Sequence, residues 1–384
     1  MMCLTALNLY DKFKSTYRVN SRLILFVFYI AGLKLINEKV WNIGRYIMNN
    51  EITVKRAVLH VLDINSGIPV LSRGELEITG ELSDYLGSHI DKMLEDSNLK
   101  NAVFTGEDSS ILRLCKLLND TEDDFLSITA DAANKLFLLM QKNIDIPSAD
   151  LVCCLLEING AKHLGVIKLN YKAGFTHWVH NANGGSVNTI IRHKTLLPQE
   201  GQRLEECALI DLSNFGIKLL EKQYEINGVN EFYLAKYYLQ CSCQLSDNAK
   251  LKILDKVTKS INKKYFDEDF EKAIKVKKAV TESFEETSSI QIDRIADQVF
   301  EKDVAIRREY VDEIEKAGLN EKEITIPDRL IEKKFKTHKI KTDTGIEIDF
   351  PLEYAGNRDK IEFVNNSDGT ISIIIRNIGR ITNR

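Results

Sequence analysis

The stretch from residue 327 to residue 379 reads PDRLIEKKFKTHKIKTDTGIEIDFPLEYAGNRDKIEFVNNSDGTISIIIRNIG, and it combines clustered lysines with a regular strand pattern. Apolar and polar residues alternate along it, and alternation places them on opposite faces of a strand. The apolar face would contain Ile340, Ile346, Ile348 and Phe350. Asp368-Gly369 separates two apolar runs, and a tight hairpin turn needs such residues because they tolerate positive φ. The stretch therefore predicts a small C-terminal β-sheet with one face free to meet a partner.

The lysine-rich half of this stretch is the candidate nucleic-acid-binding site. We expect residues 333–341 to form a strand whose cations contact DNA: Lys333, Lys334, Lys336, Lys339 and Lys341. Phe335 and His338 lie between them, and a groove that follows a phosphate backbone combines cations with side chains that stack on bases. Lys263 and Lys264, in a lysine-rich helix expected over residues 250–264, are additional candidates. Lysines that protect an edge strand or cover the outer face of a helix are the more common explanation of both patterns.

The composition is that of an ordinary globular protein with room for two or three domains. The chain has 384 residues, of which 44% are apolar and 28% charged. Its seven cysteines are odd in number and scattered, which favours a reducing cytoplasm over a disulfide framework. The net charge is −4, and residues 1–47 carry five more basic than acidic side chains, so residues 48–384 carry −9. Net charge will not draw this protein onto DNA, so any contact must be local, weak and sensitive to salt.

The first 47 residues differ from the rest of the chain. Residues 23–33 form an apolar run, LILFVFYIAGL, behind four basic residues. A signal peptide has this order of parts, but no small-residue cleavage site follows, and the run is too short to span a bilayer. Met48 begins the strand-like segment MNNEITVKRAVLH. We therefore expect residues 1–47 to be an extension outside the mature structure, with translation from Met48. A membrane tether is the alternative.

The remaining chain predicts an α+β fold: a mixed sheet with helices, a helical middle region and a small C-terminal β-sheet. The α+β domain, the helical region and the β-rich end are expected at residues 48–225, 226–322 and 323–384. In the helical region, Ser246 is a typical N-cap, and it precedes a helix with one apolar side. Further helices are expected at residues 267–286, 291–302 and 304–316.

In the first domain, helical periodicity follows Thr79 and Thr121. Strands are expected at residues 52–62, 150–156, 164–169 and 187–197. The run LVCCLL at 151–156 has no polar alternation, which is typical of a strand covered on both faces. Asn159-Gly160 after it predicts a hairpin to the next strand. These segments predict helices packed on a sheet.

None of the short motifs of nucleotide-binding or hydrolytic enzymes occurs in the sequence. The nearest set of metal-ligand residue types is His177, His180, His193 and Cys207. On a strand the first two histidines point to opposite faces, whereas a metal needs convergent ligands. Cys241-Ser242-Cys243 lacks the two-residue spacing of redox pairs. Scattered surface acids are the more common explanation of the remaining catalytic candidates, Asp349, Glu353 and Asp359. We therefore expect no enzymatic activity, no cofactor and no metal.

The order and spacing of several segments resemble the bacterial nucleoid-associated protein family typified by YejK/NdpA of Gram-negative bacteria. The segments are ITVKRAVLH at 52–60, LVCCLL at 151–156, LIDL at 209–212, EFYL at 231–234 and the terminal strands from Gly345 to Ile378. The resemblance extends from about Asn49 to Ile378. It implies a cytoplasmic location and association with the bacterial nucleoid, and it carries over no catalytic residues. A protein held on the nucleoid by DNA-bound partners would share the acidic charge of the matched region.

The sequence supports two functional hypotheses. In the first, the protein is a non-enzymatic nucleoid-associated protein that binds DNA weakly through the lysines named above. In the second, it is a protein–protein interaction module whose helices between residues 267 and 316 bind another protein or a second copy of the chain. DNA is then reached only through partners. Neither hypothesis includes a membrane partner. Direct DNA binding must weaken as salt rises, and this separates the two.

Overall fold

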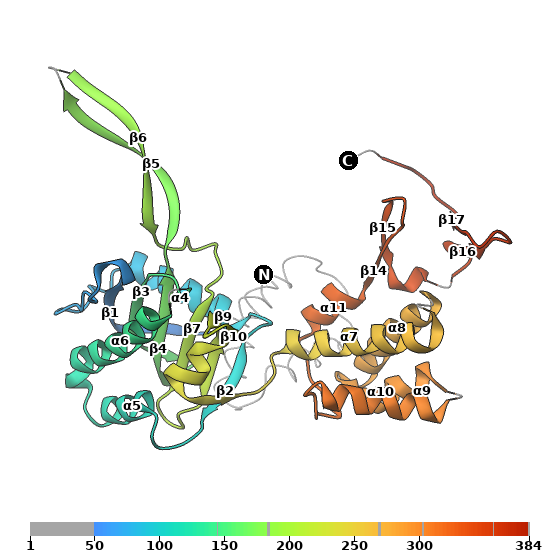
Figure 1. The fold of residues 1–384 in the computed structure, drawn as a ribbon, viewed down its shortest axis with the longest axis horizontal. Coiled ribbons are helices and arrows are strands. Elements are labelled where there is room, and N and C mark those ends of the chain that lie inside the picture. The colour runs from blue at the N-terminus through green and yellow to red at the C-terminus, as the bar shows by residue number, and fades with distance from the viewer. Residues whose placement is uncertain are drawn as a thin grey trace, which may run out of the picture. The chain divides into compact units, whose positions relative to one another are not determined.

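Figure 1 shows the computed structural model of the chain, which describes residues 50–143, 145–182, 185–267, 270–301, 303–355 and 357–382. The expected extension over residues 1–47, translation from Met48 and the alternative membrane tether lie outside these residues. Within the described ranges, no helix is both long enough and apolar enough to cross a membrane. The fold is α+β, as the sequence predicts, with one seven-stranded sheet, smaller sheets and helices.

The seven-stranded sheet is antiparallel and has the order β1-β3-β4-β7-β8-β2-β11. Its strands are β1 Ile52–Leu62, β2 Lys100–Phe104, β3 Ala149–Ile158, β4 Ala161–Asn170, β7 Glu206–Asp211, β8 Ile217–Leu220 and β11 Cys241–Cys243. Three of the expected strands, at 52–62, 150–156 and 164–169, are confirmed. The sequence analysis did not predict β2. Because β11 belongs to the sheet, the sheet extends past residue 225, where we expected the first domain to end.

Strand β3 is buried on both faces, as its unbroken apolar run predicts. Leu151, Cys153 and Leu155 belong to one hydrophobic cluster, which we call the first cluster. The alternate residues belong to a second cluster on the other face: Val152, Cys154 and Leu156. The predicted turn to β4 is confirmed, because Asn159 and Gly160 have φ values of 50° and 83°. Each aliphatic side chain buried in this way contributes about 1.5–3 kcal/mol, so β3 is central to the stability of the sheet.

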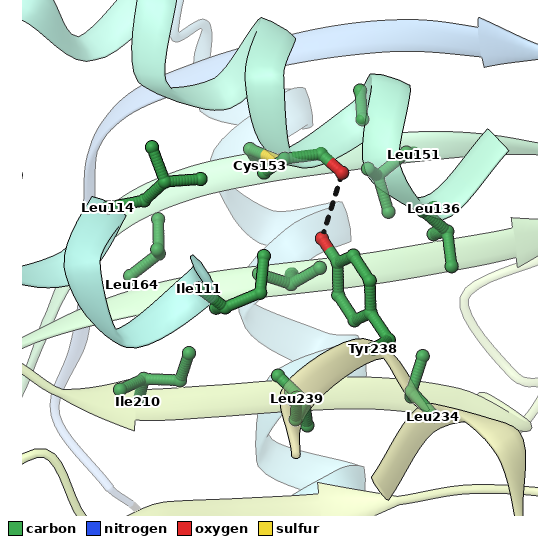
Figure 2. Close-up of a cluster of buried hydrophobic side chains, with 14 of the residues drawn as sticks. Ile111, Leu114, Leu136, Leu151, Cys153, Leu164, Ile210, Leu234, Tyr238 and Leu239 are labelled. Atoms are coloured by element: carbon green, nitrogen blue, oxygen red, sulfur yellow. Dashed lines mark hydrogen bonds between the residues drawn. The ribbon is translucent and has the colours of Figure 1, made fainter. Parts of the chain in front are cut away.

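Helices cover both faces of the sheet. The first cluster, shown in Figure 2, contains residues of α5 Ser110–Asp120, α6 Phe125–Lys142 and the π-helical turn η3 Leu234–Leu239. In it the Tyr238 hydroxyl donates a hydrogen bond to the Ala132 carbonyl at 3.1 Å, which satisfies the polar group of a buried ring. The second cluster contains residues of α4 Gly80–Leu94, whose first turn is capped by Thr79. The short turns η1 Ile64–Ser66 and η2 Glu122–Asp124 connect these elements.

The strand expected at residues 187–197 exists, but it does not belong to the seven-stranded sheet. Among the described strands, β6 Gly185–Leu196 pairs with β5 Lys172–Ala182 alone, and we call this pair the β5–β6 ribbon. The two strands run side by side as a long hairpin in Figure 1. Every residue of β6 is exposed. The pattern of residues in a strand therefore predicted the strand itself, but neither its partner nor whether one of its faces is buried.

The helical region contains α7 Asp247–Phe266, α8 Phe270–Thr287, α9 Ile292–Val299 and α10 Val304–Lys316. Ser246 caps α7 as predicted, because its hydroxyl accepts a hydrogen bond from the backbone N–H of Ala249. The apolar sides of these helices form a third cluster, in which Ile295 and Ile314 are fully buried. Two short strand pairs complete the region and its border: β9 Tyr224–Ile226 with β10 Val229–Glu231, and β12 Ile290–Gln291 with β13 Glu323–Ile324.

The C-terminal end consists of a helix and two hairpins rather than one small sheet. Its elements are α11 Asp328–Phe335, β14 Thr337–Lys341 paired with β15 Glu347–Pro351, the turn η4 Leu352–Tyr354, and β16 Ile361–Asn365 paired with β17 Ile371–Ile375. The turn predicted at Asp368-Gly369 is confirmed, with a φ of 84° at Gly369. Of the expected apolar face, Ile340, Ile348 and Phe350 belong to a fourth cluster, whereas Ile346 is exposed. Among the described strands, β14 pairs with β15 and β16 with β17, and the two hairpins do not join into one sheet.

Candidate nucleic-acid interface

The five candidate lysines lie on two elements: Lys333 and Lys334 on α11, Lys339 and Lys341 on β14, and Lys336 between them. The strand that we expected over residues 333–341 is therefore wrong in its first half. The reason is that Leu330, Ile331 and Phe335 recur at helical spacing and pack against the third cluster. Pro327 immediately precedes the helix. Proline suits the start of a helix because it has no backbone N–H, and the first N–H groups of a helix have no partner within it. The lysines thus do not form one continuous row along a strand.

On the β14–β15 hairpin, each lysine faces an acid across the two strands. Lys339 Nζ lies 3.0 Å from Asp349 Oδ2, and Lys341 Nζ lies 3.0 Å from Glu347 Oε1. The strand register places the same residues directly opposite each other. Cross-strand pairs of opposite charge stabilise a hairpin. The charges of these two lysines are therefore balanced within the hairpin.

The other described candidates also have partners within the chain. Lys334 Nζ donates a hydrogen bond to Asn248 Oδ1 at 2.6 Å, and Lys336 pairs with Glu332. On α7, Lys264 Nζ lies 2.6 Å from Glu309 Oε1, and Lys263 lies beside it in the last turn of the helix. Residues 323–384 contain eleven basic and ten acidic residues, so this end of the chain is close to neutral. Its charge alone gives little attraction for a polyanion.

Phe335 and His338 do not form an exposed stacking surface, so the base-stacking interpretation is wrong. Phe335 packs against the third cluster. His338 is only 6% exposed, and its ring centroid lies 5.6 Å from that of Phe350. His338 is therefore an interior ring, and Phe335 is partly buried. Base stacking at this site would need side chains other than these two.

Lowering the pH from 7 to 5 is expected to destabilise the folded protein through His338. Burial, together with the nearby Lys277 ammonium, lowers the pKa of His338 from 6.5 to about 4. In this pH range the unfolded chain takes up a proton that the folded imidazole does not. The stabilisation is therefore complete above pH 6.5 and is lost as the pH falls toward 4. Thermal unfolding at both pH values measures the effect, and in His338→Phe the dependence on pH should be smaller. Equal dependence in both proteins would contradict the assignment.

The β5–β6 ribbon is an exposed element without acidic residues, and the sequence analysis did not single it out as a binding site. Every residue of β6 is exposed, and so are the residues of β5 from Phe175 to Asn181. No aspartate or glutamate occurs between Glu157 and Glu200, a span that includes both strands. Among the residues that the structure describes, Arg192 and Lys194 have no carboxylate partner. The absence of acidic residues from this span can be read directly from the sequence. The local net charge would therefore have indicated the ribbon, whereas the number of lysines did not.

The strand register assigns the side chains of the ribbon to two faces. Directly opposite residues share a face, so Phe175 lies beside Arg192, and the same face, which we call the Arg192 face, continues with His177, Ile190, Val179 and Asn188. The opposite face carries Thr176, Ile191, Trp178, Thr189, His180 and Val187. Phe175, Ile190 and Trp178 are 75%, 77% and 56% exposed. Grouped apolar side chains in contact with water indicate an interaction surface.

A family model described as nucleoid-associated protein YejK matches residues 58–382 of the chain. The chain belongs to this family. A comparison with curated proteins finds no match. The YejK match begins within β1 and continues past β17, so it includes the sheet, the β5–β6 ribbon, the helical region and the C-terminal hairpins. The family resemblance, expected from about Asn49 to Ile378, is confirmed by this match over residues 58–382.

The structure does not bring together the candidate metal ligands of this YejK family member. His177 lies on the Arg192 face of the ribbon, whereas His180 and His193 lie on the opposite face. Cys207 is buried in β7, and the pair Cys241 and Cys243 lies on the edge strand β11. No group of three or more residues able to hold a metal ion occurs among the described residues. Of the three acids, Asp349 pairs with Lys339, and the others lie in η4 and the turn after it.

Lys168 and Glu206 form a buried ion pair within the sheet. Glu206, which is fully buried, accepts hydrogen bonds from Lys168 Nζ at 2.7 Å, Asn170 Nδ2 at 2.9 Å and the hydroxyls of Tyr233 and Tyr224 at 2.5 and 2.9 Å. Burial lowers the pKa of Lys168, and the Glu206 carboxylate opposes this effect. The adjoining cavity has a volume of about 10 Å³, room for about one water molecule. Buried groups with shifted pKa values often mark active sites. Among the described residues, this network joins β4 to β7 and to the two tyrosine hydroxyls.

Proposed function

We propose that this protein is a non-enzymatic nucleoid-associated protein of the bacterial cytoplasm that binds DNA directly and weakly. The observation that carries the proposal is the match of residues 58–382 to a family described as nucleoid-associated. The net charge of −9 over residues 48–384 makes long-range attraction to DNA unfavourable, so binding depends on a local surface. Weak, salt-sensitive affinity for duplex DNA of any sequence is the expected property.

In this proposal, the candidate lysines contact phosphates: Lys333, Lys334, Lys336, Lys339, Lys341, Lys263 and Lys264. The side chains of Lys336, Lys339 and Lys341 are 58%, 77% and 69% exposed, so their ion pairs lie in water. Exposed ion pairs contribute little to stability, and a phosphate can replace the carboxylate partner. Their present partners nevertheless compete with DNA, which keeps the contribution of each lysine small.

Gel-shift titration of the full chain on a duplex, repeated between 50 and 200 mM salt, tests direct binding. The logarithm of the affinity should fall linearly with the logarithm of the salt concentration, with a slope of roughly −0.9 for each phosphate contacted. Replacing Lys339 and Lys341 by glutamine should weaken binding and make the slope shallower by about 1 per lost contact.

The chain offers a matched control of opposite sign. Asp349→Asn with Glu347→Gln removes the acids that face Lys339 and Lys341, so it should strengthen binding if these lysines contact DNA. Unchanged affinity in both double variants would remove the hairpin lysines from the interface. Absence of any shift by the unmodified protein at 50 mM salt would show that DNA is not bound directly.

A protein-interaction module is the second candidate, and a specific observation favours it. The helices between residues 267 and 316 bury their apolar sides in the third cluster. Exposed apolar side chains instead lie on β17 and the residues after it: Ile371, Ile375, Ile378 and Ile381. An exposed strand edge with apolar side chains is a surface on which another protein adds a strand. If DNA is not bound directly, replacing Ile371 and Ile375 by serine should release the protein from the nucleoid.

A further inference from the structure

We propose that the β5–β6 ribbon is the principal DNA-contacting element, with its Arg192 face against the major groove of a duplex. This inference rests on the proposed direct binding of DNA and names the surface that performs it. It differs from the sequence-based site, because none of the seven candidate lysines lies on the ribbon.

The local charge of the ribbon favours contact with DNA. Arg192 and Lys194 lie on an exposed strand within a span that contains no acid, and within the described part of the chain neither has a carboxylate partner. By contrast, Lys336, Lys339, Lys341 and Lys264 each pair with a carboxylate. A phosphate that binds the ribbon therefore displaces only water and counterions, whereas one that binds those lysines must also displace an acid. The ribbon is the local basic surface that an acidic protein needs for a polyanion.

The dimensions of the ribbon match those of a DNA groove. The strands have 11 and 12 residues, and a rise of about 3.3 Å per residue gives the ribbon a length of roughly 35 Å. This is close to one turn of B-DNA. Two strands lie about 4.8 Å apart, and the major groove, about 12 Å wide, admits a two-stranded β-ribbon. The ribbon can therefore follow the groove over a large part of one helical turn.

The side chains of the Arg192 face have the chemistry to contact phosphates, sugars and base edges. Arg192 supplies the charge on this face, and Asn188 supplies an amide that can donate to and accept from base edges. Phe175 and Ile190 are three-quarters exposed beside them and offer apolar contacts to sugars and thymine methyl groups. At the base of the ribbon, a bulge places Lys194 and Thr195 opposite Ala173, and bulges commonly redirect side chains at binding sites. Between the bulge and the tip, the opposite face carries Trp178 but no Lys or Arg, and Lys172, opposite Leu196, lies beyond the bulge at the base of the ribbon.

A second copy of the chain is the competing occupant, because both outer edges of a two-stranded ribbon are open. Charge argues against it. Pairing of two ribbons would join two basic spans, with no carboxylate in either span to balance Arg192 and Lys194. DNA supplies the missing negative charge, so we favour DNA as the occupant.

The test compares three full-length proteins on one duplex by gel shift at 50–200 mM salt: the unmodified chain, Arg192→Gln with Lys194→Gln, and a control. The control is Arg113→Gln with Lys116→Gln on α5, which removes the same charge from exposed side chains paired with Asp108 and Glu107. The ribbon variant should lose roughly ten- to hundredfold in affinity, and its salt slope should become shallower by about 2, whereas the control should match the unmodified protein. Thermal unfolding should change little in both variants because none of the four side chains is buried.

A second pair of variants tests the face. Phe175→Ser should weaken binding, and Trp178→Ser, which removes an exposed aromatic ring from the opposite face, should not. Equal loss of binding in these two variants would overturn the assignment of the Arg192 face.

The outcomes separate this inference from the function on which it rests. Failure of the unmodified protein to bind DNA would refute the proposed function itself. Normal binding by the Arg192→Gln, Lys194→Gln variant would refute the ribbon site and leave direct binding intact. Tighter binding to single-stranded than to duplex DNA would refute docking in a groove. A dimer that dissociates only in the ribbon variant, with DNA affinity unchanged, would assign the ribbon to self-association.

Discussion

Replacement of Glu206 by glutamine is expected to lower the free energy of unfolding by about 3–5 kcal/mol, because it leaves the Lys168 ammonium buried without a counter-charge. Both side chains of this ion pair are almost completely buried, with 2% and 0% of their surface exposed. Lys168 has only Asn170 Oδ1, at 2.5 Å, as a further acceptor among the described residues. An amide oxygen cannot replace the carboxylate, so the remaining positive charge destabilises the sheet between β4 and β7.

Urea unfolding followed by circular dichroism measures this effect. Asp255→Asn is a matched control, because it breaks an ion pair with Lys259 whose side chains are 59% and 75% exposed, and it should cost less than about 1 kcal/mol. The double variant Glu206→Gln with Lys168→Met removes both charges and should recover much of the lost stability. If the double variant were less stable than Glu206→Gln alone, the buried charge could not be the cause.

Replacement of Leu136 or Ile295 by alanine is expected to destabilise the protein by about 2–5 kcal/mol each, because both side chains are fully buried and each leaves a cavity. Leu136 belongs to the first cluster and Ile295 to the third, and these clusters share no residues. If the sheet and the helical region are separate domains, as we propose, each variant should lower the unfolding temperature of one transition and leave the other unchanged.

Differential scanning calorimetry resolves such transitions. Leu138→Ala, on the same helix as Leu136 but 46% exposed, is the control and should change neither transition appreciably. A single transition that both core variants shift equally would show that the sheet and the helices unfold as one unit. The proposed division of the chain into domains would then be wrong.

Local patterns in the sequence were sufficient for the centre of the fold. The run at 151–156 and Asn159-Gly160 specified a buried strand and its hairpin, because both signals depend on residues close in sequence. The strand at 187–197 was recognised, but its place in the molecule was not. Its membership of a sheet depends on contacts between distant residues, and an exposed ribbon has nearly the same alternation as a half-buried strand.

For a similar reason, the positions of the lysines in the sequence did not reveal that their charges are paired with acids. Glu347 and Asp349 were visible in the sequence, but only the pairing of β14 with β15 shows that they lie opposite Lys341 and Lys339. The helix α11 was missed because Leu330 and Ile331 run directly into the alternating residues of β14, so the two periods overlap within a few positions. Counting acids as well as lysines would have directed attention to residues 158–199.

The position of β2 in the sheet has a consequence for folding during synthesis. This strand, at residues 100–104, lies between β8 and β11, the latter from residues 241–243. A nascent chain that ends before residue 217 therefore exposes both edges of β2, and one that ends before residue 241 still exposes one. The β3–β4 hairpin can form early because its strands are adjacent in the sequence. The sheet can be completed only after residue 243 has emerged from the ribosome. Ribosome-bound chains shorter than this should be much more accessible to proteases than the completed domain.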